Sequence, residues 1–272
     1  MQALQGLIDT YKNSKHVQSL LSAFSKNNLA RIKIEGGVDA FESFLLAGLN
    51  EHKNFSHIFI AGSKEQAAYI LNTLESLVQE QAILFFPDSF KRPGNYEELD
   101  RNNILIRTES INKISNKLQA HEVMLTYPEA LFEKVVDPAI INKRKISISS
   151  GENVDVDTMI ELMIEYGFER VDFVYDPGHF SVRGGIIDIF SYGNEWPYRV
   201  ELFDEEVESI RTFNPTTQLS IRSIQKISII PDINREYSSE DKISVFETFG
   251  EDTIIWIQDS DLLTDKIQNC HD

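Results

Sequence analysis

The chain has 272 residues, of which 42% are hydrophobic and 25% are charged, and its formal net charge is −17. This composition is typical of a globular protein that has a real core and room for two modest domains. A domain that holds nucleic-acid phosphates by itself is expected to be basic, so the acidity favours a protein partner over direct binding of DNA.

Simple counts disfavour several other classes of protein. No stretch is long and apolar enough to span a membrane, and the first residues lack the basic and apolar regions of a signal peptide. The single cysteine, Cys270, excludes an internal disulfide and makes a structural zinc site unfavourable. The six histidines have no metal-binding spacing. We therefore expect a cytoplasmic protein with no metal site and no catalytic residues in this chain.

Up to Thr126 the sequence alternates between segments with helical and strand patterns. The expected helices are Leu4–Phe24 (as one or two), Lys64–Val78 and Asn102–Leu118, and the expected strands are Ala30–Ile34, His57–Ala61, Ile83–Pro87 and Glu122–Thr126. Such alternation predicts a parallel, doubly wound sheet of helicase-like type. The polar segment Asp88–Asp100 is predicted to be an ordinary surface loop.

Strand, glycine turn and helix follow one another around Gly36, which is the context of a phosphate-binding P-loop. The P-loop pattern has a second glycine, a lysine and a hydroxyl residue where this chain has Phe41, Glu42 and Ser43. Phenylalanine would crowd a phosphate and glutamate would repel it, so only the hydroxyl remains. The segment is either a degenerate P-loop or a plain strand-to-helix turn, and both interpretations predict no ATPase activity and no cofactor.

After Thr126 the alternation breaks. The expected elements are helices at Pro128–Val135 and Asp155–Tyr166, and strands at Lys145–Ser149, Phe180–Phe190, Tyr198–Phe203 and Val207–Phe213. The last three strands predict an antiparallel meander in an inserted α+β domain, 127–215. The first domain, 1–126, is expected to resume over 216–272, with a strand at Ser223–Ile230, a helix at Ile243–Phe249 and a strand at Thr253–Ile257. The uncapped C-terminus suggests a fragment of a longer protein.

The meander has two features that concern its surface. Apolar Tyr198, Val200 and Leu202 alternate with Arg199, Glu201 and Phe203, which predicts one apolar face and one charged face. Gly184-Gly185 stands inside a predicted strand, where glycine weakens the structure. A β-bulge is the simpler explanation, and the close approach of a partner's backbone is the functional one. The neighbouring Arg183 suits a carboxylate-bearing partner.

These residues also carry a family resemblance. The runs SVRGGIIDIF and PYRVELFDEEVESIRTFNPTTQ resemble the signature of the UvrB-type interaction domain. The sequence departs from that signature at Ser191, often proline in the family, and at Asp204, often glycine. The family includes the excision-repair protein UvrB and the transcription-repair coupling factors. UvrB keeps a working P-loop, so the degenerate loop here favours a resemblance to the N-terminal UvrB-like region of the coupling factors.

The resemblance implies a function. It implies that the inserted domain recruits the excision-repair protein UvrA during transcription-coupled nucleotide excision repair. It also implies that the full-length protein is an ATP-dependent DNA translocase, which meets RNA polymerase and DNA only through later domains. The alternative is a UvrB-like, ATP-dependent helicase fragment that binds DNA.

The candidate partner-binding residues all lie in or beside the meander. We expect Arg170, Arg183 and Arg199 to anchor a partner, and Phe180, Ile187 and Phe190 to shape the surface around Gly184 and Gly185. Arg183 and Phe190 follow from their positions in the family signature. Asp188 and Glu201 lie on neighbouring strands, but nothing in the sequence builds a catalytic pocket around them.

Overall fold

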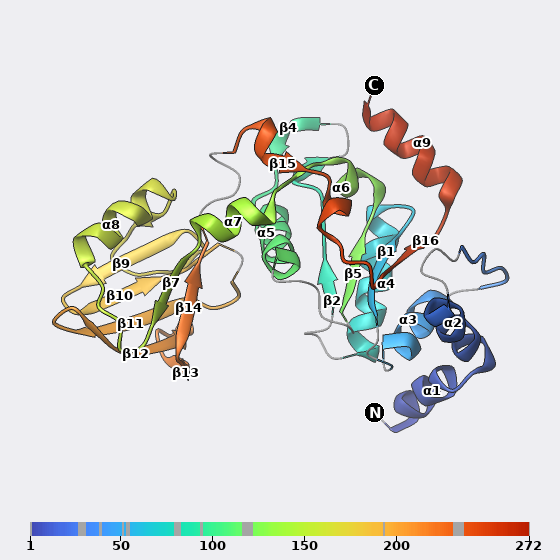
Figure 1. Ribbon diagram of the computed structural model, residues 1–272, viewed down its shortest axis with the longest axis horizontal. Coiled ribbons are helices and arrows are strands. Elements are labelled where there is room, and N and C mark those ends of the chain that lie inside the picture. Colours follow the sequence, from blue (N-terminus) through green and yellow to red (C-terminus); the bar gives the residue numbers. More distant parts are fainter. Residues whose placement is uncertain are drawn as a thin grey trace. The chain divides into compact units, whose positions relative to one another are not determined.

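The computed structural model describes residues 2–26, 31–37, 40–50, 52, 55–78, 83–92, 95–115, 122–192, 194–230 and 237–271. The chain divides into two compact units (Figure 1). Unit 1 comprises Met1–Asn103, Asn116–Lys134 and Ser244–Asp272, and unit 2 comprises Ile104–Ser115 and Val135–Ile243.

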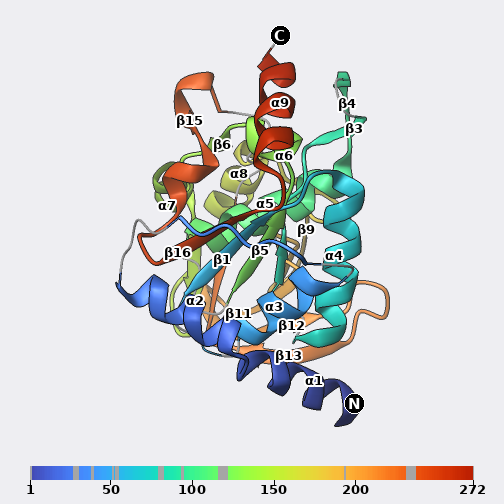
Figure 2. The ribbon, with the colours of Figure 1, turned by 90° about the vertical axis from the view of Figure 1, so that its right-hand side faces the viewer.

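Unit 1 is built on a parallel β-sheet. In the described part of the chain this sheet has four strands in the order β16 (Thr253–Ile257), β1 (Ser56–Ile60), β5 (Val123–Thr126) and β2 (Ile83–Phe85). All residues of β1 and β5 are buried, as expected for central strands that are covered on both faces. Strand β16 lies beside β1 although it comes from near the end of the sequence (Figure 2).

Helices surround this sheet. They are α1 (Gln2–Lys12), α2 (Lys15–Lys26), α3 (Phe41–Asn50), α4 (Lys64–Leu77), α6 (Pro128–Phe132) and α9 (Ser260–His271), with a short 3-10 helix at Val245–Thr248. Helix α4 begins where Ser63 caps it, because the Ser63 side chain accepts a hydrogen bond from the backbone N–H of Gln66. Val17 and Leu20 of α2 pack with Leu45 and Leu49 of α3.

Two expectations for this region are wrong. The described part of the predicted strand Ala30–Ile34 forms no strand, and Arg31–Gly37 are exposed, so no neighbouring strand pairs with them. The predicted loop Asp88–Asp100 contains an antiparallel pair, β3 (Phe90–Arg92) and β4 (Asn95–Leu99). The backbone N–H of Asp100 donates to the carbonyl of Ser89 at 2.9 Å, which closes the base of this pair. Helix α9 was not predicted.

Unit 2 is built on a mainly antiparallel sheet. Within the described ranges it has six strands in the order β13 (Ser220–Ile224), β12 (Glu206–Phe213), β11 (Tyr198–Phe203), β10 (Ile186–Ile189), β9 (His179–Arg183) and β8 (Glu169–Arg170). Only the short β8 pairs in parallel, with β9. The mixed α/β class, the parallel sheet and the antiparallel meander are therefore confirmed.

The remaining elements of unit 2 include two small strand pairs. Strand β7 (Ile146–Ser149) pairs with β14 (Lys226–Ile229), and β6 (Val135–Val136) pairs with β15 (Lys242–Ile243). The helices are α7 (Pro138–Arg144), α8 (Val156–Glu165) and a 3-10 helix at Ser239–Asp241, while α5 (Arg101–Ser115) begins in unit 1 and continues in unit 2. We expected residues after 215 to return to the first domain, but β13 and β14 pair within unit 2.

The main core of unit 2 lies on one face of its sheet. Met159 and Met163 of α8, Ile148 of β7 and Ile227 and Ile229 of β14 pack there. They meet the buried side chains Phe180, Ile187, Ile189, Val200, Val207 and Ile210 of the sheet. Asp155 starts α8 by accepting a hydrogen bond from the backbone N–H of Thr158 at 2.8 Å. This packing leaves the opposite face of the sheet to carry the polar side chains.

Candidate protein-interaction surface

The two faces of the unit 2 sheet differ in chemistry, as the alternation in β11 predicted. Val200 is buried in the core, with Tyr198 and Leu202 packed against it. Arg199 and Glu201 point to the opposite face and join charged networks there, and Phe203 is 72% exposed. The side-chain period of two thus separates an apolar face from a charged one.

Gly184 and Gly185 form the turn of a β-hairpin. Arg183 pairs with Ile186, so the two glycines are the only residues between β9 and β10. Gly184 has a φ of +59°, which favours glycine. A β-carbon on Gly185 would lie 2.7 Å from the carbonyl oxygen of Leu202. The predicted β-bulge at this pair is therefore wrong, and the backbone that comes close is the chain's own strand β11.

A buried carboxylate organises the charged face. The Asp188 side chain is fully buried and lies opposite Arg199 in the pairing of β10 with β11. Arg199 donates from Nε to Asp188 Oδ1 at 2.7 Å and from Nη2 to Oδ2 at 2.8 Å. Arg183 donates from Nη2 to the same Oδ2 at 2.6 Å. A buried carboxylate requires such compensation, and two guanidinium groups supply one positive charge more than it needs.

Aromatic rings and backbone carbonyls hold both arginines in place. The Arg199 guanidinium lies 4.5 Å from the centre of the Phe213 ring, and that of Arg183 lies 5.0 Å from the centre of Phe173. Arg183 Nη1 also donates to the backbone oxygen of Asp172. The hydrogen bond to Asp188 raises the pKa of the Arg199 side chain above its ordinary value. Both cations are therefore fixed before any partner arrives.

A second charged pair continues the face on the next strands. Glu201 accepts hydrogen bonds from the hydroxyl of Ser209 at 2.8 Å and from Arg211. The Ser209 hydroxyl, and then Arg211, lower the pKa of Glu201. This pair is internally neutral, so the excess positive charge of the face belongs to the cluster around Asp188.

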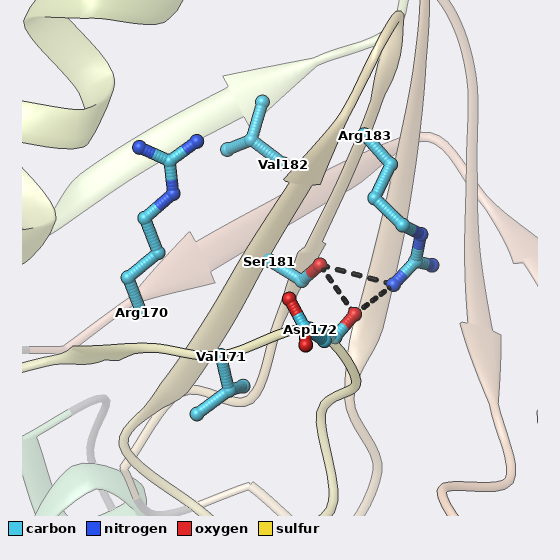
Figure 3. A pocket seen from close by; sticks show the side chains of 6 residues that line it. All are labelled: Arg170, Val171, Asp172, Ser181, Val182 and Arg183. Atoms are coloured by element: carbon cyan, nitrogen blue, oxygen red, sulfur yellow. Dashed lines mark hydrogen bonds between the residues drawn. The ribbon is translucent and has the colours of Figure 1, made fainter.

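Beside this cluster the surface is hollowed by about 490 Å³. The hollow is lined by Arg170, Val171, Asp172, Ser181, Val182 and Arg183 (Figure 3). In Figure 3 the side chains of Arg170 and Arg183 lie on either side of Val182. Arg170 is exposed and, within the part of the chain that the structure describes, makes no hydrogen bond or ion pair. The hollow therefore offers one free cation next to an arginine that is already positioned.

Comparison with known proteins bears directly on this unit. Residues 146–237 match the family described as the UvrB interaction domain. The predicted resemblance is therefore confirmed.

The curated relatives extend the similarity beyond this domain. The chain is 29% identical over 226 residues to the transcription-repair-coupling factor of Bacillus subtilis, which covers 81% of this chain and 18% of the relative. It is 28% identical over 192 residues to the factor of Haemophilus influenzae (68% and 16%), and 25% identical over 207 residues to that of Myxococcus xanthus (74% and 17%). The chain thus spans less than a fifth of the length of these relatives.

All eight predicted partner-binding residues fall within residues 146–237, which match the UvrB interaction domain, but the structure separates them into different environments. Gly184 and Gly185 are exposed, Arg170 and Arg183 line the hollow, and Arg199 lies deeper, with its side chain 16% exposed.

The three apolar candidates require a correction. Phe180 and Ile187 belong to the main core, and Phe190 packs with Val174 and Phe213 in a small cluster. Their exposed fractions are 0, 1 and 5%, so they cannot form part of a docking surface. Phe180 and Ile187 lie at inward positions of the sheet, whereas Phe190 lies on the side of Asp188 and packs against Phe213, the ring that the Arg199 guanidinium covers.

Sequence reasoning missed the central part played by Asp188. The sequence placed Asp188 beside Glu201 on a neighbouring strand and gave it no role. In the structure, Asp188 forms ion pairs with Arg199 and Arg183. The signal was available, because Asp188 and Arg199 stand at outward positions of two strands expected to be neighbours. Phe173 was also missed; it is 50% exposed and lies in an irregular segment with no periodic pattern.

The region of the predicted degenerate P-loop has a different geometry from the one expected. Gly36 has a φ of +83° and is exposed, but no strand precedes it in the described residues. A β-carbon on Gly37 would meet the ring of Phe41 at 2.6 Å, so this aromatic side chain occupies space beside the turn. Glu42 and Ser43 follow in the first turn of α3.

Neither a metal site nor a membrane span emerges from the described residues. They contain no group of three or more His, Cys, Asp or Glu side chains placed to hold a metal ion. Their helices also include none that is long and apolar enough to cross a membrane.

Proposed function

We propose that this chain is the UvrA-recruiting part of a transcription-repair coupling factor and acts in transcription-coupled nucleotide excision repair. The observation that carries the proposal is the UvrB interaction domain at residues 146–237, within a longer similarity to three coupling factors. In this proposal RNA polymerase and DNA are bound by other parts of the full-length protein, which is an ATP-dependent translocase.

The hollow at the edge of the unit 2 sheet suits a protein partner with exposed carboxylates. Arg170 is exposed and unpaired among the described residues, and Arg183 lines the same hollow from the charged face, with its side chain 36% exposed. Arginine binds a carboxylate with two parallel hydrogen bonds, and a fixed guanidinium loses little conformational entropy on binding. Because the net charge of the chain is −17, a carboxylate-bearing partner can be attracted only where arginines form a local patch.

We further propose that this chain hydrolyses no nucleotide. Glu42 stands where a P-loop has its lysine, and a carboxylate there repels phosphate. The strand that normally leads into a P-loop is also missing from the described residues before Gly36. The parallel sheet of unit 1 then serves as a scaffold of helicase-like ancestry.

The test is calorimetric titration of UvrA into the 272-residue chain and its variants. Arg170→Ala is expected to weaken binding about fivefold or more, because a central arginine in an interface is commonly worth over 1 kcal/mol. Arg31→Ala is the matched control, because Arg31 is exposed in unit 1. The thermal unfolding of Arg170→Ala should equal that of the unaltered chain, since this side chain has no partner to lose among the described residues.

Two outcomes would reject the proposal. One is no measurable binding of UvrA to the unaltered chain, and the other is equal affinity of Arg170→Ala and Arg31→Ala. A thermal shift with ATP addresses the rival interpretation separately. Stabilisation by ATP would favour a UvrB-like, nucleotide-binding fragment over the proposed recruiting module.

A further inference from the structure

A second hollow, in unit 1, lies where the sequence places its degenerate P-loop. Its volume is about 330 Å³. It is lined by Glu42 and Ser43 of α3, by Glu65, Gln66, Tyr69 and Ile70 of α4, and by Gln258. The two helices contribute their N-terminal turns, so the hollow has the position of a phosphate site but carries carboxylates.

Two of the lining side chains, those of Ser43 and Glu42, have no polar partner among the described residues. The Ser43 residue is 1% exposed, and its hydroxyl has no hydrogen-bond partner among the described residues. A buried hydroxyl without a partner is unfavourable, so the Ser43 hydroxyl gains from a hydrogen bond with a ligand. Glu42 is partly buried, and within the described ranges its carboxylate forms neither a hydrogen bond nor an ion pair.

The charges at this hollow exclude an anion. Two carboxylates line it, and no lysine or arginine is among its lining residues. Nearby Lys64 and Lys266 act electrostatically on Glu65, but they lie 3.5 Å from Asp88 and 2.9 Å from Glu129, respectively, and neither forms an ion pair with Glu42. Both glutamates lie in the first turns of their helices, and the pKa of Glu65 is lowered by its own backbone N–H and by the Ser63 hydroxyl. A phosphate would therefore meet two like charges.

We propose that this hollow binds an alkylammonium cation, such as a lysine side chain of a partner or a polyamine. Glu42 and Glu65 supply the opposite charge, the Ser43 hydroxyl accepts a hydrogen bond, and the ring of Tyr69 offers an aromatic face. Two carboxylates are too few to hold a bare metal ion tightly, whereas an ammonium group keeps its own three donors. The site lies wholly within unit 1 and is independent of UvrA recruitment.

The proposal can be tested by NMR titration of the isotopically labelled 272-residue chain with two amines, Nα-acetyl-lysine methylamide and spermidine. Saturable shifts are expected at the backbone amides of Ser43, Glu65 and Tyr69. Glu42→Gln should weaken binding about fivefold or more, because it removes one charge at constant shape. Glu75→Gln, which makes the same change at an exposed position of α4, should leave affinity unchanged.

The two amines distinguish the sources of the cation. Saturation by the lysine compound assigns the site to a partner's side chain, and saturation by spermidine alone assigns it to a polyamine. Shifts that do not saturate, or equal affinity in Glu42→Gln, would overturn the proposal. It would also be overturned if ATP, titrated at the same ionic strength, saturated the same amides.

Discussion

Each of the two sheets buries one titratable side chain, and the two are accommodated in opposite ways. In unit 1, His57 of β1 is 2% exposed, and burial lowers its pKa to about 4, so it stays neutral. Trp256 donates a hydrogen bond to His57 Nδ1 at 3.2 Å, which a neutral ring can accept. In unit 2, Asp188 is fully buried and is ion-paired with two arginines.

This difference explains why one face of the unit 2 sheet is charged. A neutral histidine needs no counter-charge, so the sheet of unit 1 can enclose it among apolar side chains. A buried carboxylate needs cations, and arginines long enough to reach it also extend toward solvent. The charged face of unit 2 is thus a consequence of the buried Asp188, and it supplies Arg183 to the hollow where we place the partner.

The largest expected effect comes from removing the cation that holds Asp188 most closely. Arg199→Ala should lower the free energy of unfolding of unit 2 by about 3 to 5 kcal/mol, because it leaves a buried carboxylate with only one partner. The change can be followed by the fluorescence of Trp196 in a Trp256→Phe background, since these are the two tryptophans of the chain and lie in different units. Arg31→Ala is the control, and a loss below about 1 kcal/mol would show that Asp188 does not depend on this pair.

The next effect concerns pH and the sheet of unit 1. The pKa of His57 is about 4 in the folded chain and 6.5 in the unfolded one, so below pH 6.5 the unfolded state binds more protons. The stability of unit 1 should therefore be complete above pH 6.5 and fall by about 3 kcal/mol as the pH approaches 4. Fluorescence of Trp256 in a Trp196→Phe background measures it.

His57→Gln provides the comparison, because glutamine does not titrate and the other histidines are shared by both chains. The difference in unfolding free energy between the two chains should change between pH 6.5 and 4. If that difference stayed constant, His57 would not be held neutral by burial.

The smallest of the three effects tests the hairpin that brings Arg183 beside Asp188. Gly185→Ala should destabilise unit 2 by about 1 to 3 kcal/mol, because the new β-carbon would lie 2.7 Å from the Leu202 carbonyl oxygen. Gly250→Ala, where nothing lies within 4 Å, should change stability by less than about 0.5 kcal/mol. If the two variants had equal urea midpoints, the closeness of Gly185 to the Leu202 carbonyl oxygen would not explain why this turn has glycine.

Much of the fold was predictable because its signals are local. The alternation in Tyr198–Phe203 assigned side chains to the correct faces of β11, and the apolar runs located β1, β2 and β5. The family signature lies within the region that matches the UvrB interaction domain. The prediction was wrong for 31–34, the described part of Ala30–Ile34, because a strand-like pattern forms a strand only where a neighbour is available for pairing.

The candidate surface was predictable in kind but not in detail. The outward positions of Arg183 and Arg199 follow from their sequence spacing, but the buried state of Phe180, Ile187 and Phe190 depends on what packs against each face. Whether Gly184-Gly185 is a bulge or a turn depends on the pairing of Arg183 with Ile186.

The sequence by itself determined the alternation of elements, the acidity, the residue types at the P-loop positions and the family resemblance, because each depends on residue type and spacing along the chain. Only the tertiary structure decided that two arginines share one buried carboxylate. It also decided that β16 pairs with β1, where 197 residues separate Ser56 from its partner Thr253. The pairing of β16 joins positions far apart in the chain, and the energy of the Asp188 cluster depends on distances of a few ångströms that no sequence pattern encodes.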